Sequence, residues 1–327
     1  MTSAVIRALI PPLSEADARA WSAVVAGAHA ADLPGVPAPT PVEIAGRLRI
    51  PSVNSRFALW AAEEGVAALQ LFTDAGNAHT AHLDALVVRP GARRRGLGTV
   101  LWERVRAELV AQGRSSVSTV LDLGGPGEAF ASSLGFRNVL PLAWYVQQVP
   151  GRATDQVPGR RGEAARTPGY ELVLWDGLVP DAWAAAAATA HGAMEDAPSG
   201  DMDARPPVWT PERLHTVQQV VLDRGGRMLM AAAVTPDGEV AAYTSLVLLD
   251  PVGPRALQYD TVVVPAHRGR GLGRAVKLHM LAQAPARWPS LREIGTSVAD
   301  ENTPMRAVNE ALGYRRERAA GVFQLSL

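Results

Sequence analysis

One glycine-rich motif occurs twice in this chain, and this repeat constrains the fold more than any other feature of the sequence. The first copy, Arg-Arg-Arg-Gly-Leu-Gly, occupies residues 93–98, and the second, Arg-Gly-Arg-Gly-Leu-Gly, occupies residues 268–273, an offset of 175. Leu-Gly-Phe at residues 134–136 is likewise echoed by Leu-Gly-Tyr at residues 312–314, an offset of 178. Because two features recur in one order at nearly one spacing, the sequence predicts a duplicated domain.

Each motif has the local chemistry of an anion-binding turn. An apolar, valine-rich run followed by Pro90 or Pro265 predicts a strand ahead of the motif, and a helix is predicted directly after it. Such a turn directs free backbone N–H groups and the positive end of the helix dipole to one spot. The glycines let a phosphate come close to the backbone, and the arginines add positive charge around it.

Length and composition set the class of protein. The 327 residues correspond to about two domains. With 32 basic and 32 acidic side chains, the chain lacks the basic excess that nucleic acid or an anionic membrane normally requires, so neither is expected as a partner. It contains no cysteine, which excludes disulfides, cysteine-ligated zinc and a thiol nucleophile. The sequence has no recognisable signal peptide or membrane-spanning run, so we expect a cytoplasmic protein, and we expect no metal site.

The predicted elements divide the chain into two similar halves. We expect an N-terminal domain at residues 1–150, a linker rich in glycine, proline and arginine at residues 151–169, and a C-terminal domain at residues 170–327. Each half is predicted to contain a strand, two helices, three strands, a helix, a strand, a helix and a closing strand. The closing strands are predicted at residues 142–149 and 321–327. The expected fold class is α/β, as an α+β arrangement with a mixed sheet in each of two tandem domains.

This arrangement resembles the GCN5-related N-acetyltransferase (GNAT) superfamily, in a tandem two-domain bacterial form. The two glycine motifs, Leu-Gly-Phe at residues 134–136 and the run Asn302-x-x-Met305-x-x-x-Asn309-x-x-Leu-Gly-Tyr carry the resemblance. It covers nearly the whole chain outside the linker and is closer in the second half. There Thr-Val-Val-Val-Pro-Ala-His-Arg-Gly at residues 261–269 is similar to the pattern of one bacterial subgroup.

The resemblance implies an enzyme that binds acetyl-coenzyme A (acetyl-CoA) and transfers its acetyl group to an amine. The diphosphate would lie on the N–H groups of the glycine motif, and the pantetheine arm would pair with the edge of the preceding strand. One N–H of that edge would polarise the thioester carbonyl. The implied coenzyme-binding residues are Val262, Val263, Val264, Arg268, Gly269, Arg270, Gly271, Leu272, Gly273, Arg274, Asn302 and Asn309 in the second half, and Val87, Val88, Arg93, Arg94, Arg95, Gly96, Leu97 and Gly98 in the first.

Direct attack by an amine requires a group that takes the proton of the amine. Asp260, near the end of its predicted strand, is the first candidate for this base, directly or through water. Glu195 and Asp196 are further candidates. They lie in an acidic loop in the region that usually shapes the acceptor site of this superfamily, so the loop predicts a cationic amine as acceptor.

The proton donor for the departing thiolate is unassigned. Many members of the superfamily carry a tyrosine at the position that Asn309 occupies in this chain. Tyr259, Tyr314 and solvent are the remaining alternatives. Asn302 has two interpretations, a contact with the coenzyme or the N-cap of the following helix.

The two halves differ at three aligned positions, where the first half has small side chains and the second half has polar ones. The first half nevertheless keeps its glycine motif. We therefore expect a degenerate first domain, either structural or binding coenzyme without turnover, and a catalytic second domain. The aligned pairs are Ala85 and Asp260, Gly124 and Asn302, and Ala131 and Asn309.

Two functions stay open at this point. One is an N-acetyltransferase acting on a primary amine, with a small cationic metabolite preferred over an antibiotic, an amino acid or a protein lysine. The alternative is a non-catalytic acyl-CoA-binding or sensor protein with two GNAT-like domains. A dinucleotide-binding oxidoreductase is disfavoured, because Leu101 and Val276 stand where Gly-x-Gly-x-x-Gly requires its third glycine. The expected oligomeric state is a monomer or a homodimer.

Overall fold

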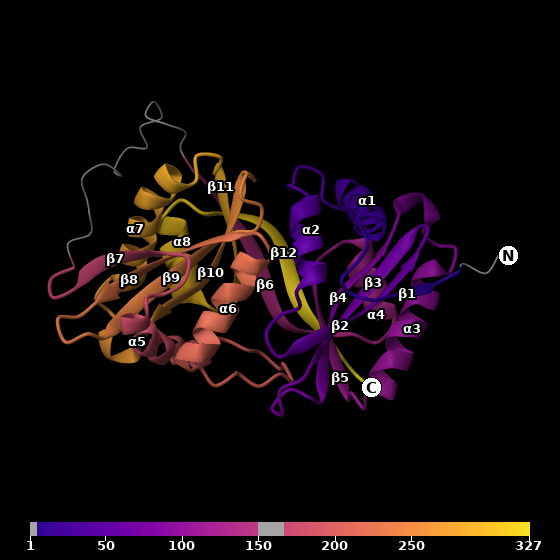
Figure 1. Ribbon diagram of the computed structural model, residues 1–327, viewed down its shortest axis with the longest axis horizontal. Coiled ribbons are helices and arrows are strands. Elements are labelled where there is room, and N and C mark those ends of the chain that lie inside the picture. The colour runs from indigo at the N-terminus through magenta and orange to yellow at the C-terminus, as the bar shows by residue number, and fades with distance from the viewer. Residues whose placement is uncertain (1–4, 150–166) are drawn as a thin grey trace. The chain divides into compact units, whose positions relative to one another are not determined.

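In the computed structural model, which describes residues 5–149 and 167–327, the chain forms two compact units (Figure 1). The first unit consists of Met1–Pro141, Ser199–Arg205 and Ala319–Leu327, and the second of Leu142–Pro198 and Pro206–Arg318. Of the linker predicted at residues 151–169, residues 151–166 lie outside the described part of the chain.

The first unit is a mixed sheet with helices on both faces, and its strands follow the order β1-β2-β3-β4-β5-β12. Along β3, Val66 and Ala68 face α1 and α2, whereas Ala67 and Leu69 face α3. This alternation is what a strand buried on both sides produces. The elements are β1 (Arg7–Leu9), α1 (Glu15–Asp32), α2 (Pro41–Arg49), β2 (Ser55–Ala62), β3 (Gly65–Phe72), β4 (Thr80–Val88), α3 (Leu97–Ala111), β5 (Ser116–Asp122), α4 (Pro126–Ser133) and β12 (Arg315–Ser326).

The second unit repeats this plan, with the strand order β6-β11-β10-β9-β8-β7. Along β8, Met230 and Ala232 face α5 and α6, while Leu229 and Ala231 face α7. Thr210 begins α6 by accepting a hydrogen bond from the Arg213 N–H. The elements are β6 (Arg137–Gln148), β7 (Glu171–Asp176), α5 (Asp181–Gly192), the 3-10 helix η2 (Ala193–Asp196), α6 (Pro211–Asp223), β8 (Arg227–Val234), β9 (Val240–Leu248), β10 (Arg255–Val263), α7 (Leu272–Arg287), β11 (Glu293–Ala299) and α8 (Thr303–Ala311).

The last strand of each sequence half belongs to the other unit. Residues 142–148 of β6 pair antiparallel with β11 of the second unit, and residues 320–326 of β12 pair antiparallel with β5 of the first. Both strands had been predicted to close their own halves. The compact units therefore differ from the continuous domains that the repeat suggests, because the sixth strand of each sheet comes from the other half of the chain.

The central parallel strands of each unit form a fork. In the second unit, β10 pairs with β11 only from Arg255↔Glu293 to Leu257↔Gly295, although both strands continue beyond these residues. In the first unit, the pairing of β4 with β5 is limited in the same way to residues 80–82 and 116–118. We call the place where β4 and β5 part the first fork, and the place where β10 and β11 part the second fork.

A bulge lies beside each fork. The register between β10 and β9 shifts between Gln258 and Thr261, and the register between β4 and β3 shifts at the equivalent place. Because a bulge inserts one residue, it interrupts the alternation of side chains along the strand. Gln258 can therefore reach Lys277 on α7, while Asp260 faces His191 on α5.

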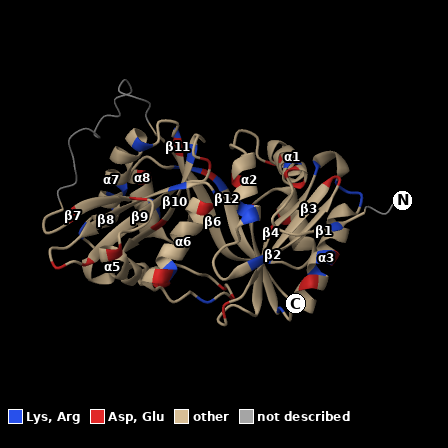
Figure 2. Cartoon of the chain, in the orientation of Figure 1, with Lys and Arg blue, Asp and Glu red and all other residues tan. Residues whose placement is uncertain are grey.

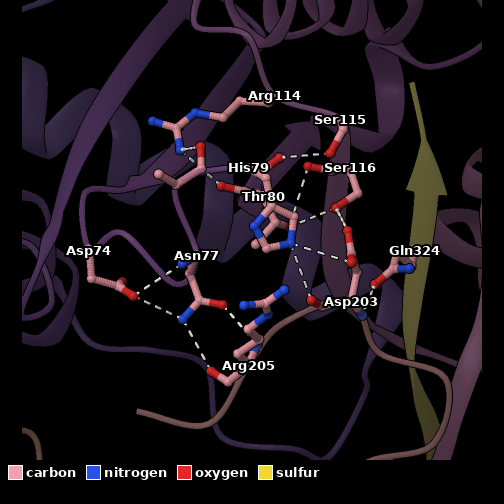
Figure 3. Close-up of polar contacts among 11 residues, drawn as sticks. Asp74, Asn77, His79, Thr80, Arg114, Ser115, Ser116, Asp203, Arg205 and Gln324 are labelled. Carbon is pink, nitrogen blue, oxygen red and sulfur yellow. Dashed lines mark hydrogen bonds and ion pairs between the residues drawn. The ribbon is translucent and has the colours of Figure 1, made fainter. Parts of the chain in front are cut away.

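The first unit also includes Ser199–Arg205, a segment from the second half of the sequence (Figure 3). The Asp203 carboxylate accepts a hydrogen bond from Ser116 Oγ at 2.6 Å and lies 3.3 Å from His79 Nε2. The backbone N–H of Arg205 donates to Asn77 Oδ1 at 2.8 Å. Through these hydrogen bonds and this ion pair, residues 199–205, in the middle of the connection between η2 and α6, bind to the rest of the first unit.

Basic and acidic side chains are interspersed along the described chain (Figure 2). The longest described helix, α1, has 18 residues and carries acidic side chains in its first turn. None of the helices in the described ranges combines the length and the apolar character that crossing a membrane requires.

Candidate active site

The second glycine turn, residues 268–273, leads from β10 into α7 through the 3-10 helix η3 (Pro265–His267). Gly269 and Gly271 adopt left-handed conformations, with φ of 76° and 74°. A Cβ atom at either position would meet no atom within 4 Å. Glycine is therefore favoured here by backbone conformation, and the surface above the turn is open for a ligand.

The start of α7 provides N–H groups for an anion. The first intrahelical bond runs from the Ala275 N–H to the Gly271 carbonyl at 3.0 Å, so the preceding N–H groups of the helix have no intrahelical acceptor. The helix dipole adds positive potential at this end. The first glycine turn, residues 93–98, has the same construction: Gly96 has a φ of 89°, and the Val100 N–H donates to the Gly96 carbonyl at 3.0 Å.

The first arginine of each turn braces the turn itself. Arg268 Nε donates to the Val263 carbonyl at 3.2 Å, and its guanidinium pairs with Asp196 at 2.6 Å. Arg93 donates in the same way to the last carbonyl of β4 at 3.0 Å and forms two bonds to Asp32 at 2.6 and 2.7 Å. Both arginines are among the residues implied to bind the coenzyme, and their side chains hold the turn against neighbouring elements.

The other residues of the turns divide between packing and surface. Leu272 is buried and packs in a cluster with Val263, and a Cβ at Gly273 would lie 3.4 Å from a Val263 methyl group. Leu97 and Gly98 occupy the equivalent places in the first turn. Arg270 contacts the Tyr170 hydroxyl. Arg94, Arg95 and Arg274 are exposed beside the two turns, as are Arg268 and Arg270, whose side chains make the contacts described above.

The second fork leaves one edge of β10 open. The register with β11 ends at Leu257, whereas β10 continues to Val263. The Val264 N–H is turned the other way and donates to the Ala241 carbonyl at 3.0 Å. The edge formed by Val262 and Val263 therefore matches the place predicted for the pantetheine arm, and Val87 and Val88 have the corresponding position at the first fork.

Asp260 lies on the bulge of β10 and faces α5. Its side chain keeps 39% of its surface exposed, and its Oδ2 lies 4.0 Å from His191 Nε2. Desolvation by the surrounding protein raises the pKa of Asp260 to about 6, although a backbone hydrogen bond opposes the shift. At neutral pH the carboxylate is mostly ionised and is a stronger base than an ordinary aspartate, so it can accept a proton.

His191 and Tyr243, which no sequence motif marked, lie beside Asp260. The Tyr243 hydroxyl is hydrogen-bonded to His191 Nδ1. Burial lowers the pKa of His191 to about 4, helped by Arg213, and burial together with Asp260 raises the pKa of Tyr243 well above its ordinary value. Both groups are therefore neutral at pH 7. If Tyr243 donates to Nδ1, the imidazole proton lies on Nε2 and faces the Asp260 carboxylate.

An aromatic residue covers this group of side chains. The Trp209 ring lies 3.5 Å from the His191 ring, measured between centroids, and the Arg213 guanidinium lies 5.6 Å from the Trp209 ring. His191 follows an alanine-rich run and Tyr243 lies in a wholly buried strand. The residues around His191 and Tyr243 in the sequence are those expected around any core residue, so no local pattern marks either one as functional.

The acidic loop contributes less than the sequence suggested. Glu195 and Asp196 lie in η2, which packs against β10, and both are exposed. Asp196 is held by Arg268 in the ion pair that braces the second glycine turn. Glu195 is the other acidic residue of η2, and its side chain is exposed.

Asn302 and Asn309, at the start of α8 and within it, were both implied to bind the coenzyme, and both have structural roles. Asn302 is the N-cap and accepts a hydrogen bond from the Met305 N–H at 3.2 Å. Asn309 has 0% exposure, and its Oδ1 accepts a hydrogen bond from Lys277 at 2.7 Å. Because a fully buried side chain offers no surface to a ligand, Asn309 does not fit the predicted role of a coenzyme contact.

The described residues fit coenzyme A. A diphosphate needs hydrogen-bond donors and room close to the backbone, and each glycine turn supplies unbonded N–H groups beneath an open surface. An extended arm ending in a thioester needs a free strand edge, and each fork supplies one.

Comparison with known proteins agrees with this geometry. The Acetyltransferase (GNAT) family model matches residues 35–136 and 194–314. A tandem GNAT protein from the clavulanic acid biosynthesis pathway superposes with a TM-score of 0.79 at 24% identity, covering 98% of both chains. A GCN5-related N-acetyltransferase from Sphaerobacter thermophilus gives a TM-score of 0.67 at 17% identity, covering 98% of this chain and 95% of the other. No curated protein matches the sequence.

Since the family model matches more than half of the chain, in two segments, the chain belongs to the GNAT family and is a tandem-domain, acetyl-CoA-dependent acyltransferase.

Proposed function

We propose that the second unit transfers the acetyl group of acetyl-CoA to the primary amine of a small cationic metabolite. The observation that carries this proposal is the position of Asp260, an ionisable carboxylate with a pKa of about 6 beside the open edge of the second fork. A base with this pKa is ionised at neutral pH and is close enough to that pH for efficient proton transfer. The exposed Glu195 supports a cationic acceptor.

Each part of the second unit has a role in this proposal. When bound, acetyl-CoA supplies an acetyl group that its thioester has activated for attack. The N–H groups at the start of α7 hold the diphosphate, and the edge formed by Val262 and Val263 holds the arm. Asp260 accepts the proton of the attacking amine, while His191 fixes the orientation of the carboxylate.

Release of the coenzyme thiol from acetyl-CoA, measured against a panel of amines, tests the proposal. The chain has no cysteine, so a thiol reagent detects only the released coenzyme. We expect the fastest release with small amines that carry a further positive charge. Tight binding of acetyl-CoA without thiol release for any amine would favour the non-catalytic sensor.

For the first unit we infer coenzyme binding or structural support without turnover. Ala85 stands at the position equivalent to Asp260, and Val66 stands at the position equivalent to Tyr243. The unit thus keeps its glycine turn and its fork but has alanine in place of the proposed base, and the neighbouring carboxylate of Asp84 is 7% exposed and paired with Arg47.

A further inference from the structure

The core of the second unit contains a lysine. Lys277, on α7, is 1% exposed, and its Nζ donates hydrogen bonds to Gln258 Oε1 at 2.9 Å and to Asn309 Oδ1 at 2.7 Å. It also lies 5.0 Å from the centroid of the Tyr314 ring. These groups face it from β10, from α8 and from the residue before β12, and within the described ranges no carboxylate pairs with it. Two amide oxygens and an aromatic face form a suitable environment for an ammonium group.

The hydrogen bonds of Lys277 extend to the second fork. Gln258 follows the last residue of β10 that pairs with β11, and its Nε2 donates to Thr244 Oγ1 at 2.8 Å. Thr244 Oγ1 is in turn 2.8 Å from Thr261 Oγ1. From the other side of the fork, Thr296 Oγ1 donates to the Gln258 carbonyl at 3.0 Å. The buried charge is therefore connected to both strands where they part.

The first unit builds the same fork and bulge with only one of these polar groups, Thr119, which donates to the Leu83 carbonyl at 2.9 Å as Thr296 does to that of Gln258. Trp102 takes the place of Lys277 and packs edge-to-face on Phe136, with ring centroids 5.4 Å apart. The framework therefore does not require a buried lysine. Burial also carries a cost, because desolvation lowers the pKa of Lys277 to about 7. The equivalent pairs are Leu83 and Gln258, Trp102 and Lys277, Ala131 and Asn309, Phe136 and Tyr314, Ala67 and Thr244, and Leu86 and Thr261.

We propose that Lys277 is a positioning residue whose positive charge beneath the second fork stabilises the thiolate that leaves there. The inference rests on the proposed function. In the transfer, the amine nitrogen bonds to the acetyl carbon, the carbon–sulfur bond breaks, and its electron pair goes to sulfur. The proton of the amine goes to Asp260. A thiolate stabilised by a nearby cation needs no proton at that moment.

Titration of the thiol of bound coenzyme A tests this proposal without relying on turnover. The thiolate absorbance is followed in the wild type, in Lys277→Met and in Tyr314→Phe, each with Gly96→Asp to close the first glycine turn. Because the chain has no cysteine, the absorbance difference between coenzyme-bound and coenzyme-free protein reports on the coenzyme. Because the pKa of Lys277 is about 7, the lysine has to hold its proton when the thiolate forms, so the two groups titrate together. We expect the bound thiol to lose its proton at a pH at least about one unit lower in the wild type than in Lys277→Met. Tyr314→Phe, which keeps the lysine, should retain the lowered value.

The same pKa of the bound thiol with and without the lysine would overturn the proposal. If Lys277→Met does not fold, because it leaves the Asn309 carbonyl without a donor, the double variant Lys277→Met with Asn309→Ala removes both polar groups. Calorimetry with coenzyme A distinguishes a failure of the proposed function from a failure of the role proposed for Lys277. Absence of binding would reject the proposed function and this inference together, whereas binding with an unchanged thiol pKa would reject only the role of Lys277.

Discussion

The two units share one framework but differ in the chemistry of their cores. Both have a glycine turn, a fork between parallel strands and a bulge beside the fork. In the first unit, apolar side chains such as Trp102 and Phe136 fill the space behind the fork. In the second unit, Lys277 and its hydrogen-bonding partners fill the same space. The first unit demonstrates that folding does not require the polar groups, so their presence in the second unit points to function.

The same contrast exists on the opposite face of the sheet. Asp260 and Tyr243 of the second unit correspond to Ala85 and Val66 of the first. Ionisable groups whose pKa values are strongly shifted, as those of Asp260 and Tyr243 are, are common at functional sites. An internal duplicate therefore provides a control that a single domain does not offer.

The largest expected effect comes from Asp260→Asn, which removes the proposed base from the second unit. The first unit has no carboxylate at the equivalent position, where Ala85 stands. We expect kcat to fall by about 10²- to 10⁴-fold, because general-base catalysis contributes an effect of this size. The affinity for acetyl-CoA should not change. In the wild type, activity should fall as the pH drops below about 6, because protonated Asp260 cannot accept a proton.

Glu195→Gln is the matched control for Asp260→Asn, since both substitutions remove one carboxylate from the proposed acceptor side. Its effect should be confined to KM for the amine and remain within a few-fold. If Asp260→Asn kept more than a tenth of the wild-type kcat, the assignment of the base would be wrong.

The next largest effect concerns stability and pH in the core of the second unit. Lys277 has a pKa of about 7 when folded, against an ordinary value of 10.5. Between these pH values the unfolded chain holds a proton that the folded chain has lost, so stability should rise with pH. Between pH 7 and pH 9 the rise is about 2–3 kcal/mol at most. Urea unfolding should detect it in the wild type, and the double variant Lys277→Met with Asn309→Ala should abolish it.

A smaller effect is expected for Tyr243→Phe, which removes the hydroxyl group that binds His191 Nδ1. Loss of this contact frees the imidazole to rotate away from Asp260, so we expect kcat to fall about tenfold. Tyr145→Phe, at another buried tyrosine of the same unit, should leave kcat within twofold. Equal effects of the two variants would argue that the hydroxyl of Tyr243 contributes only to packing.

The smallest effect is expected in the segment that binds to the first unit. The hydrogen bond from Ser116 lowers the pKa of Asp203, so its contribution to stability is present at neutral pH and is lost as acid protonates the carboxylate. Because the side chain is partly exposed, Asp203→Asn should reduce the free energy of unfolding by no more than about 1 kcal/mol. A large loss of acetyl transfer in this variant would reveal that the segment also shapes the second unit.

Much of the fold was predictable because its signals are local. Ser14 and Thr210, whose side chains are typical of N-caps, begin α1 and α6, and each glycine turn lies between the expected strand and helix. The exchange of β6 and β12 was not predictable, because the apolar pattern of a strand does not identify the strand beside it.

The candidate site was predictable only where a motif marks it. The repeated glycine motif identified both turns, and a carboxylate near the end of a strand identified Asp260. Nothing in the sequence identified Lys277, because a lysine in a helix normally faces solvent. Only the fold brings it together with Gln258 and Asn309, which lie on other elements.

We propose that the second glycine turn serves an active unit and that the first does not. Acetyl transfer measured in Gly271→Asp and Gly96→Asp tests it directly, with Gly271→Asn and Gly96→Asn as uncharged controls that also tolerate the left-handed conformation. A Cβ at either position meets no neighbouring atom, so the carboxylate acts mainly by repelling the diphosphate. We expect Gly271→Asp to abolish transfer, whereas the activity of Gly96→Asp should stay within about twofold of that of Gly96→Asn. Full activity of Gly271→Asp, or an equal loss in both aspartate variants, would contradict it.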